Sequence, residues 1–351
     1  MRKNESALAI FSVYTAKVDE AMKKVLSTMP DYAMYGMMRY FLGFANEKLQ
    51  PVEAYAGKRF RPGLCLLFAD ILKDKKDVLD FAVAIELFHN FTLIHDDIED
   101  QDPLRRDRPT VWKLWGINHG INTGDGQLAL TNLVLAQAVK KHPNVGLEAQ
   151  IFLNQIFLRV IEGQFLDFTL AELSLSDNFV NTENVLKMIG NKTSVLVGAS
   201  CQLPGVIAGL KPADQQALWG YGFNLGLAYQ LYDDYVSIWA SEEETGKIVL
   251  NDLYEKKKTL PVLFAYSKLT GEDKERFEKI YQKTERLIDG EVEFVKKCLD
   301  QTRADDYIRG QIILYALKAK QALCCTKLLG DNRETLQNIV DELMPRIKNS
   351  K

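Results

Sequence analysis

The chain has 351 residues, of which 47% are hydrophobic, so it can bury a large core and is too apolar for a disordered chain. Its formal net charge of −3 excludes the excess positive charge typical of nucleic-acid-binding and membrane-surface proteins, so any anion site must be local. No window approaches the roughly 18 apolar residues of a membrane span, and the five cysteines form no CxxC pair. We therefore expect a cytoplasmic protein with reduced thiols in its core and no stable membrane insertion.

Apolar residues recur at helical spacing almost from end to end of the chain, whereas alternating strand patterns between turn signals are scarce. The prolines mostly stand where helices should begin or end, and no linker or repeat divides the chain. These patterns predict an all-α protein with a single domain over residues 1–351. Its motifs lie at about 50–265, and a helical tail rich in charge occupies about 266–351.

The first stretch with chemical interest is GKRFRPG, residues 57–63, which places Lys58, Arg59 and Arg61 ahead of a proline. Arginine offers fork-shaped bidentate donors to phosphate and lysine offers a compact charge, so these residues could build an anion pocket without a metal. The alternative is that they are ordinary surface cations, which is the commoner case.

A buried helix is predicted from Leu79 to Asp102, because this segment lacks Gly and Pro and its apolar residues cover most of a helix circumference. It leads into LIHDDIEDQDPLRRDRPT, residues 93–110, in which five carboxylates occupy seven positions. Asp96 and Asp100 are four apart and share one helix face, where they suit Mg²⁺ completed by water and phosphate oxygens. The alternative is a solvated acidic helix end.

Three residues around this acidic end carry further interest. His89 precedes Asp96 by one heptad and so lies near the same face, either as a satisfied core residue or as a donor to phosphate. Arg105 and Arg106 follow the acids and place cations directly beside them. Acids and bases this close predict a site that holds both a cation and an anion.

Lys192, in NKTS, is followed by an apolar helical run from Thr193 to Leu210. Because a buried lysine without a partner is costly, we expect Lys192 to meet an anion. Lys247 in TGKIVLND, and Lys257 or Lys258 in YEKKKTLP, are further candidates for an anion site.

A second long apolar helix is predicted from Ala213 to Ala240, and it too ends in acid, at Asp233 and Asp234. Two buried acidic helix ends could face each other across one cavity and clamp a diphosphate through bridging metals. Ser237 stands where a second carboxylate on the same face would be, so we expect the second site to be the weaker one.

Seven motifs share the order and approximate spacing of one known family: GKRFRP, LIHDDIEDQDPLRRDRPT, INTGD, GQFLDF, NKTS, GLAYQLYDDYVSIW and TGKIVLNDLYEKKKTLP. The chain resembles the trans-isoprenyl diphosphate synthases, the polyprenyl synthetase family, over roughly residues 50–265. The resemblance implies an isoprenoid-synthase bundle of long helices around a deep central cavity, in general a homodimer. The reaction it implies joins isopentenyl diphosphate to an allylic prenyl diphosphate.

The resemblance also implies roles by motif position. The metal ligands would be Asp96, Asp100 and Asp233, supported by Asp97 and Asp234, and the ions would be Mg²⁺, three with substrate bound, with Mn²⁺ as an alternative. The allylic diphosphate would contact Arg105, Lys192 and Lys247, and Lys257 is a further substrate-binding candidate. Isopentenyl diphosphate would be held by Lys58, Arg61, His89 and Arg106. Thr193 and Gln230 would lie beside the developing cation, and Gln164 and Asp167 near the metal site.

Product length would be set on the first acidic helix, one turn and two turns before the aspartates. The candidate positions are Phe91, Thr92, Leu87 and Phe88. A bulky Phe91 beside a small Thr92, without an insertion in the aspartate motif, resembles geranylgeranyl diphosphate synthases more than farnesyl diphosphate synthases. The alternative is that the aromatic residues are simply core.

Three other functions stay open at this point. One is a farnesyl diphosphate synthase, and another is a class I terpene cyclase, which would not need the Lys58, Arg61, His89 and Arg106 set. The third is a regulatory subunit of a heteromeric synthase, favoured by Ser237 and by Asp107, which adds a negative charge beside the arginines. A nucleic-acid-binding module is not supported, because acids interleave with the basic residues.

Overall fold

The computed structural model describes residues 6–55, 57–73, 77–240 and 250–348. These are helical apart from one small hairpin, an isolated bridge between Ala45 and Pro51 and the connections between helices, which confirms the predicted all-α fold. Contacts group the chain into two compact units, Met1–Gln155 with Ser200–Gln215, and Ile156–Ala199 with Gln216–Lys351. The single domain and its central cavity stay predictions. Among the described helices, none combines the length and hydropathy needed to cross a membrane.

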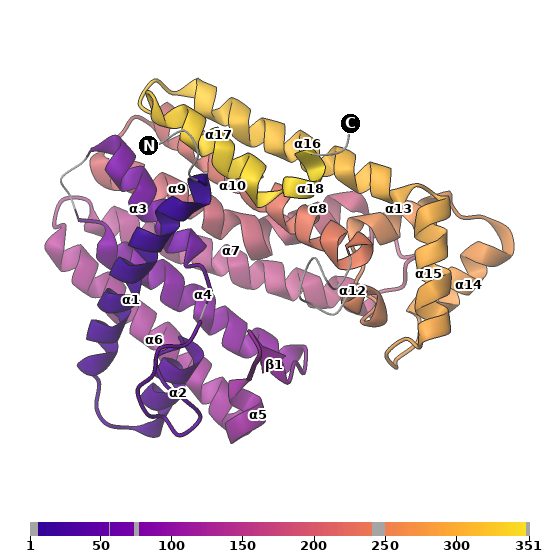
Figure 1. Cartoon of the computed structure of the whole chain (residues 1–351), viewed down its shortest axis with the longest axis horizontal. Helices are drawn as coiled ribbons and strands as arrows, with labels where there is room; N and C mark the ends of the chain where they lie inside the picture. The colour runs from indigo at the N-terminus through magenta and orange to yellow at the C-terminus, as the bar shows by residue number, and fades with distance from the viewer. Residues whose placement is uncertain (1–5, 56, 74–76, 241–249, 349–351) are drawn as a thin grey trace. The chain divides into compact units, whose positions relative to one another are not determined.

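The first unit is built around α4 (Leu79–Glu99), which packs against α1, α3 and α6 (Figure 1). The predicted helix from Leu79 is thus confirmed, and it ends three residues earlier than expected. The other elements of this unit are η1 (Ala7–Ile10), α1 (Phe11–Ser27), α2 (Ala33–Phe41), α3 (Phe60–Leu72), β1 (Leu104–Arg105), β2 (Arg108–Pro109), α5 (Val111–Trp115) and α6 (Ile117–Lys141). Residues 146–155 of α7 (Gly146–Glu172) also belong to it.

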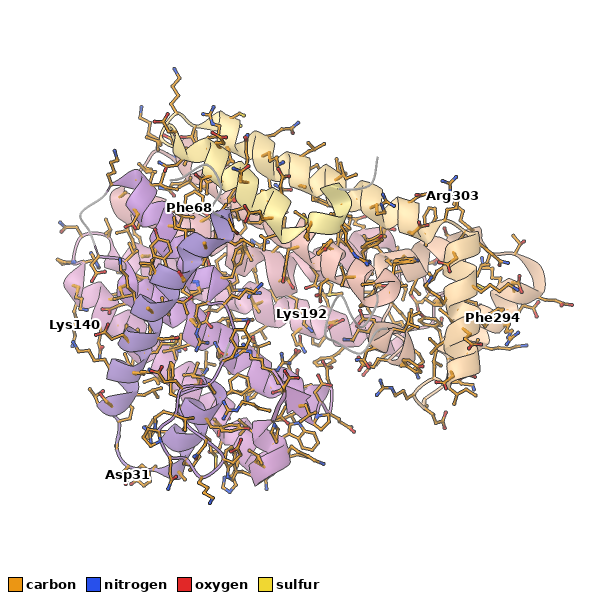
Figure 2. All side chains as sticks on the ribbon, viewed as in Figure 1. Asp31, Phe68, Lys140, Lys192, Phe294 and Arg303 are labelled. Atoms are coloured by element: carbon orange, nitrogen blue, oxygen red, sulfur yellow. The ribbon has the colours of Figure 1, made fainter. Side chains whose placement is uncertain are left out.

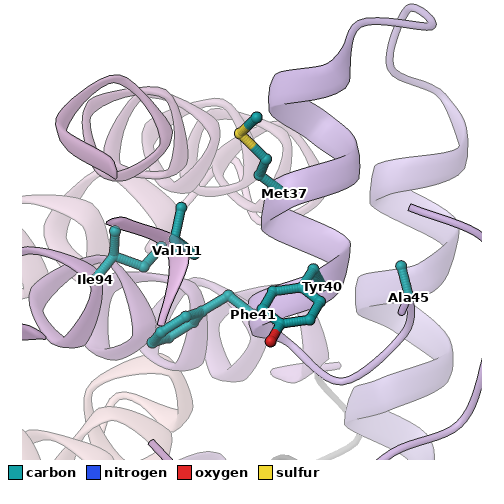
Figure 3. Close-up of a cluster of buried hydrophobic side chains, with 6 residues drawn as sticks. All are labelled: Met37, Tyr40, Phe41, Ala45, Ile94 and Val111. Atoms are coloured by element: carbon teal, nitrogen blue, oxygen red, sulfur yellow. The ribbon is translucent and has the colours of Figure 1, made fainter. Parts of the chain in front are cut away.

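A cluster of buried side chains holds the acidic end of α4 against α2. Ile94 of α4 packs with Met37, Tyr40 and Phe41 of α2 and with Val111 of α5 (Figure 3). The Tyr40 hydroxyl also donates to the carbonyl of Pro109, 2.7 Å away, in the hairpin that follows the acids. The acidic segment is therefore fixed on its apolar side by close packing.

Arg59 is a structural residue, although it stands in the basic motif. Only 3% of it is exposed, and its guanidinium donates to Asp19 (2.8 Å), to Glu86 (3.0 Å) and to the carbonyl of Leu42 (2.8 Å). It also directly precedes α3, as its N-cap residue, in a left-handed conformation with φ of 46°. One buried cation thus joins α1, the end of α2, and α4.

The second unit contains the rest of α7 and the carboxyl-terminal helices. Its elements are α8 (Thr182–Ile189), η2 (Gly190–Ser194), α9 (Val195–Ala208, shared with the first unit), α10 (Pro212–Trp239), α12 (Asn251–Tyr254), α13 (Leu260–Lys268), α14 (Gly271–Tyr281), α15 (Asp289–Gln301), α16 (Ala304–Ala322), η3 (Leu323–Cys325), α17 (Asn332–Leu343) and α18 (Pro345–Lys348). Helix α16 packs against α13, α15 and α17 (Figure 1). The helix α10 confirms the second predicted apolar helix.

The NKTS motif forms η2, a single π-helical turn between α8 and α9. A π-turn of this kind is rare and is often found at functional sites. Gly163 of α7 lies against it so closely that a Cβ atom there would be 2.2 Å from the amide nitrogen of Lys192. Lys192 therefore projects from a backbone that is fixed by direct contact with α7 (Figure 2).

The cysteines are partly as expected. Cys65, Cys201 and Cys298 are buried free thiols. The expectation of core thiols is wrong for Cys324 and Cys325, which are exposed, because the short turn η3 lies at the surface where α16 ends.

We expect Arg59→Met to lower the free energy of unfolding by about 3–5 kcal/mol, because it leaves the buried carboxylate of Glu86 without its cation. Urea denaturation measures the change. Lys23→Ala is the matched control, since the Lys23–Glu53 pair (2.7 Å) lies in solvent and its loss should hardly change the unfolding midpoint. Equal effects of the two substitutions would contradict a stabilising role for the buried network.

Gly163→Ala should destabilise the chain by about 1–3 kcal/mol, because the new methyl group collides with backbone atoms that cannot rotate away. Gly310→Ala is the control, since nothing lies within 4 Å of the equivalent Cβ position and α16 should gain up to about 1 kcal/mol from the better helix former. The two midpoints in urea should move in opposite directions. A neutral Gly163→Ala variant would show that α7 does not press against η2.

Candidate functional site

The carboxylates at the end of α4 divide into an outward pair and an inward residue. Asp100 is exposed and Asp96 is partly exposed, and the Asp100 amide donates to the carbonyl of Asp96 (2.8 Å), so the last turn is regular. Asp97 is only 1% exposed and its Oδ1 accepts a hydrogen bond from Arg105 Nε. Burial raises the pKa of Asp97 to about 7, although Arg105 opposes this.

Arg105 reaches the acids because the chain reverses immediately after α4. Strands β1 and β2 pair antiparallel, and the two residues between them, Arg106 and Asp107, both have positive φ (55° and 60°). This is the geometry of a two-residue hairpin turn, in which aspartate is a favoured residue. Asp107 is exposed at this turn, where water screens its charge from the arginines.

His89 and Arg61, two predicted substrate-binding residues, are paired with each other. Arg61 Nη1 lies 3.1 Å from His89 Nε2. A guanidinium can only donate, so Nε2 accepts and the imidazole is neutral. Burial and the nearby Arg61 and Arg106 guanidinium groups lower the pKa of His89 well below its usual value, in agreement with this assignment.

Arg106 is held against bare backbone. A Cβ atom on Gly57, whose φ is +98°, would lie 3.2 Å from Arg106 Nη2. Burial and the Arg59 charge lower the pKa of Arg106 to about 10. Its Nη1 is buried and has no hydrogen-bond partner in the described part of the chain. A partly buried cation with a buried, unused donor favours binding of an anion. Lys58, the fourth member of the predicted set, is exposed.

Arg106 also lines a small pocket in the first unit together with the other hairpin arginines. The residues around this pocket are Tyr40, Phe41, Tyr55, Arg105, Arg106, Arg108, Pro109 and Thr110. Arg108 is occupied, because it donates to the carbonyl of Ala45 (2.8 Å) and stacks 4.0 Å from the centre of the Tyr40 ring. This leaves Arg105 and Arg106 as the arginines that could turn to a ligand.

The predicted chain-length residues lie on α4 in the order expected. Leu87 and Phe88 are fully buried, Phe91 is 7% exposed, and Thr92 is partly exposed. The Phe91 ring lies 5.5 Å from the Phe88 ring and 4.9 Å from the His95 ring, measured between centroids. The three rings form a row along α4 that leads to the aspartates. Phe91 in this row is compatible both with a residue that limits product length and with an ordinary core residue.

In the second unit, Lys192 has the anionic partner that its sequence context predicts. Its Nζ lies 2.7 Å from Asp167 Oδ2 on α7. Gln164 stands three residues earlier on the same helix and is partly buried. The NKTS and GQFLDF motifs therefore form one cluster.

A chain of side-chain hydrogen bonds joins η2 to the acidic end of α10. Thr193 Oγ1 donates to Gln230 Oε1 (3.2 Å), and Gln230 Nε2 donates to Asp234 Oδ1 (3.1 Å). Burial, and then the charge of Asp252, raises the pKa of Asp234 well above its usual value. Asp233 is exposed beside it. The second acidic end thus repeats the pattern of one buried and one exposed aspartate.

Asp252 is a residue of this site that sequence reasoning missed. Ser237 Oγ donates to Asp252 Oδ2 (2.5 Å), and Lys257 Nζ lies 3.4 Å from Asp252 Oδ1 and 3.2 Å from Glu255 Oε2. The signal available was its place in NDLYEKKKTLP, five residues before Lys257. A carboxylate from α12 therefore stands beside Ser237. Lys247 lies outside the described residues.

These groups fit Mg²⁺ as an ion shared with a phosphorylated ligand. Among the described residues, no three or more histidine, cysteine, aspartate or glutamate side chains are gathered into a complete metal cage. Mg²⁺ does not need one, since it binds through one or two carboxylates and takes its other oxygens from water and phosphates. Asp97 Oδ2 is buried without a hydrogen-bond partner, so this acidic end has an unmet demand for positive charge. That the two acidic ends share one cavity stays a prediction.

Comparison with known proteins agrees with this chemistry. The family model for polyprenyl synthetase matches residues 46–300. A (2E,6E)-farnesyl diphosphate synthase of Mycobacterium tuberculosis is 38% identical over 233 residues, 66% of this chain and 63% of that protein, so the match spans less than two thirds of that relative. A geranylgeranyl pyrophosphate synthase of Geoglobus acetivorans is 33% identical over 307 residues, which is 87% of this chain and 89% of that one.

A solved structure extends the agreement to the fold. The crystal structure of a polyprenyl synthetase from Streptomyces coelicolor superposes with a TM-score of 0.84 at 27% identity, covering 95% of this chain and 98% of that chain. The family model covers more than half of the chain, and its bounds enclose every predicted site residue. The chain belongs to the polyprenyl synthetase family.

Proposed function

We propose that the protein is a Mg²⁺-dependent trans-prenyltransferase that joins isopentenyl diphosphate to an allylic diphosphate, with geranylgeranyl diphosphate as its product. The observation that carries the proposal is the Arg106 guanidinium, whose Nη1 is buried without a hydrogen-bond partner among the described residues, in the same unit as the acidic end of α4. The group around Arg106 suits a diphosphate held by cations alone. The carboxylates at the end of α4 suit a diphosphate held through metal. A terpene cyclase, with a single diphosphate to bind, would have no use for both.

Isopentenyl diphosphate is assigned to the metal-free group. Arg61, Arg106 and the exposed Lys58 supply the charge, and the neutral His89 can add a hydrogen bond from Nδ1, because its Nε2 already accepts from Arg61. Anchoring the diphosphate in this way fixes the position of the carbon–carbon double bond, and holding two reactants in line can supply a large part of the rate.

The allylic diphosphate is assigned to Arg105, Lys192, Lys247 and Lys257 and to metal held by Asp96, Asp100 and Asp233. The chemistry supplied by bound Mg²⁺ is neutralisation of the leaving diphosphate, with three ions proposed in the loaded enzyme and Mn²⁺ as a substitute. Arg105 and Lys192 already lie beside carboxylates, so each can turn from an internal partner to a phosphate. Thr193 and Gln230, which are hydrogen-bonded to each other, are assigned to stabilising the cation that forms on the prenyl carbon.

We also propose that two copies of the chain associate through α7. In the second unit, four apolar side chains of α7, spaced alternately by three and four residues, are exposed to solvent: Leu158, Ile161, Phe165 and Phe168. A long exposed apolar stripe of this kind marks an interface, and a homodimer is the commonest way to cover it.

The purified chain alone should convert isopentenyl diphosphate and farnesyl diphosphate into a twenty-carbon diphosphate when Mg²⁺ is present, and removing the metal with EDTA should abolish turnover. Product analysis across allylic starters of five, ten and fifteen carbons measures this directly. Farnesyl diphosphate recovered without extension would reject the twenty-carbon product. Complete inactivity with every starter would favour the regulatory-subunit alternative.

Phe91→Ala should lengthen the product, because it removes the bulkiest side chain one helical turn before Asp96. Chromatography of the dephosphorylated products gives the chain length. Phe81→Ala is the control, since Phe81 is a fully buried aromatic at the other end of the same helix. It should lower stability by about 3–5 kcal/mol and leave product length unchanged. Equal product lengths in the native chain and Phe91→Ala would show that Phe91 is not the floor.

A further inference from the structure

His95 directly precedes the aspartates, and the functions assigned above leave it without a role. It is partly buried, and its side chain reaches from α4 to α6, where Nε2 lies 3.2 Å from the carbonyl oxygen of Ile121. A carbonyl can only accept, so Nε2 carries the proton and donates it. The same nitrogen is 3.7 Å from Asp125 Oδ1.

The partner of His95 is the INTGD motif, residues 121–125, which also has no other assigned role. Its first residue supplies the carbonyl and its last supplies the carboxylate. Between them, Gly124 supplies space, since a Cβ atom there would lie 2.2 Å from His95 Nε2 and 2.3 Å from its Cδ2. The imidazole therefore occupies the place that any side chain at position 124 would need.

The third side of the His95 ring is closed by α4 itself. Phe91, one turn earlier, meets the imidazole edge-to-face with 4.9 Å between centroids. His95 is thus held by a hydrogen bond, a close backbone contact and an aromatic contact, which come from two helices. A side chain with all of these restraints has little rotational freedom left.

This restraint adds to the packing of Ile94 at the carboxyl end of α4. The last turn of a helix lacks partners for its carbonyls and frays, and here that turn carries both metal-binding candidates, Asp96 and Asp100. Arg105 ties the turn through Asp97 and the hairpin. His95 ties the same turn to α6 through its hydrogen bond with the Ile121 carbonyl.

We propose that His95 is a positioning residue, seated in the INTGD motif, that fixes the aspartates of α4 for a metal-bound diphosphate. The identity of the ligand, a metal-bound diphosphate, rests on the proposed function. The way in which His95 is held rests on its contact with Gly124. Residues that orient metal ligands in this way typically change metal-dependent binding by about 10–100-fold when they are removed.

Binding of inorganic diphosphate in the presence of Mg²⁺, measured by calorimetry on the full chain, tests the role without relying on turnover. His95→Ala should weaken this binding about 10-fold or more. His95→Gln should restore most of it, because the glutamine Nε2 can stand near the histidine Nε2 and donate to Ile121. A structural loss alone would not be rescued by the return of one donor.

His142 provides the matched control. Its Nε2 lies 2.6 Å from the carbonyl of Asp77 and its ring lies 5.7 Å from the Phe81 ring, so it makes the same two kinds of contact beyond the other end of α6. His142→Ala should lower the urea midpoint and leave Mg²⁺-dependent diphosphate binding unchanged. If the two alanine variants lose binding equally, or if neither loses it, the positioning role is overturned.

A double-substitution cycle tests the contact itself. Gly124→Ala should lower the urea midpoint and weaken diphosphate binding in the native background, because the new methyl group displaces the imidazole. In the His95→Ala background the same substitution should have almost no effect on either quantity. An equal effect in both backgrounds would overturn the inference while leaving the proposed function intact. A native chain that binds no diphosphate with Mg²⁺ would overturn both.

Discussion

A carboxylate buried at the carboxyl end of a helix is the constraint around which this structure is arranged. Asp97 of α4 and Asp234 of α10 are both out of water, where ionisation is costly, and Asp97 also stands in the last turn of its helix, at the negative end of the helix dipole. The pKa of each is raised accordingly. Each acidic end must therefore be supplied with hydrogen-bond donors or positive charge from elsewhere in its unit.

The irregular elements of the two units supply these partners. In the first unit the short hairpin after α4 turns the chain back and brings Arg105 to Asp97, eight residues away in sequence. In the second unit the π-turn η2 presents Thr193 to Gln230, which in turn donates to Asp234. The hairpin thus brings a donor directly to Asp97, whereas the π-turn acts through Gln230, which lies one turn before Asp234 on the same helix.

The sequence predicts the long helices and their acidic ends well, because apolar periodicity without Gly or Pro leaves few alternatives. It extends α4 to Asp102, whereas the helix stops at Glu99 because Gln101 takes a left-handed φ of 56°. It also predicts that Lys192 meets an anion. It misses the structural role of Arg59, which depends on contacts with distant segments, and it misses Asp252, which the fold of α12 brings to Ser237. The motifs show which side chains are present, and tertiary packing decides which of these side chains can face a ligand.

Glycines within the motifs show why some of this packing cannot be predicted from the charged and polar residues of the motifs alone. Gly57, Gly124 and Gly163 each place bare backbone against a neighbour, respectively the Arg106 guanidinium, the His95 ring and the backbone of Lys192. A glycine within a helix costs about 1 kcal/mol relative to alanine, so the contact it permits must contribute at least as much for the fold to keep its stability. In each case the missing side chain lets a charged or polar residue lie directly against the glycine, and this close contact limits where that residue can lie without adding a hydrogen bond to it. A glycine beside a charged motif is therefore part of the same functional unit, because it determines where the charge can stand.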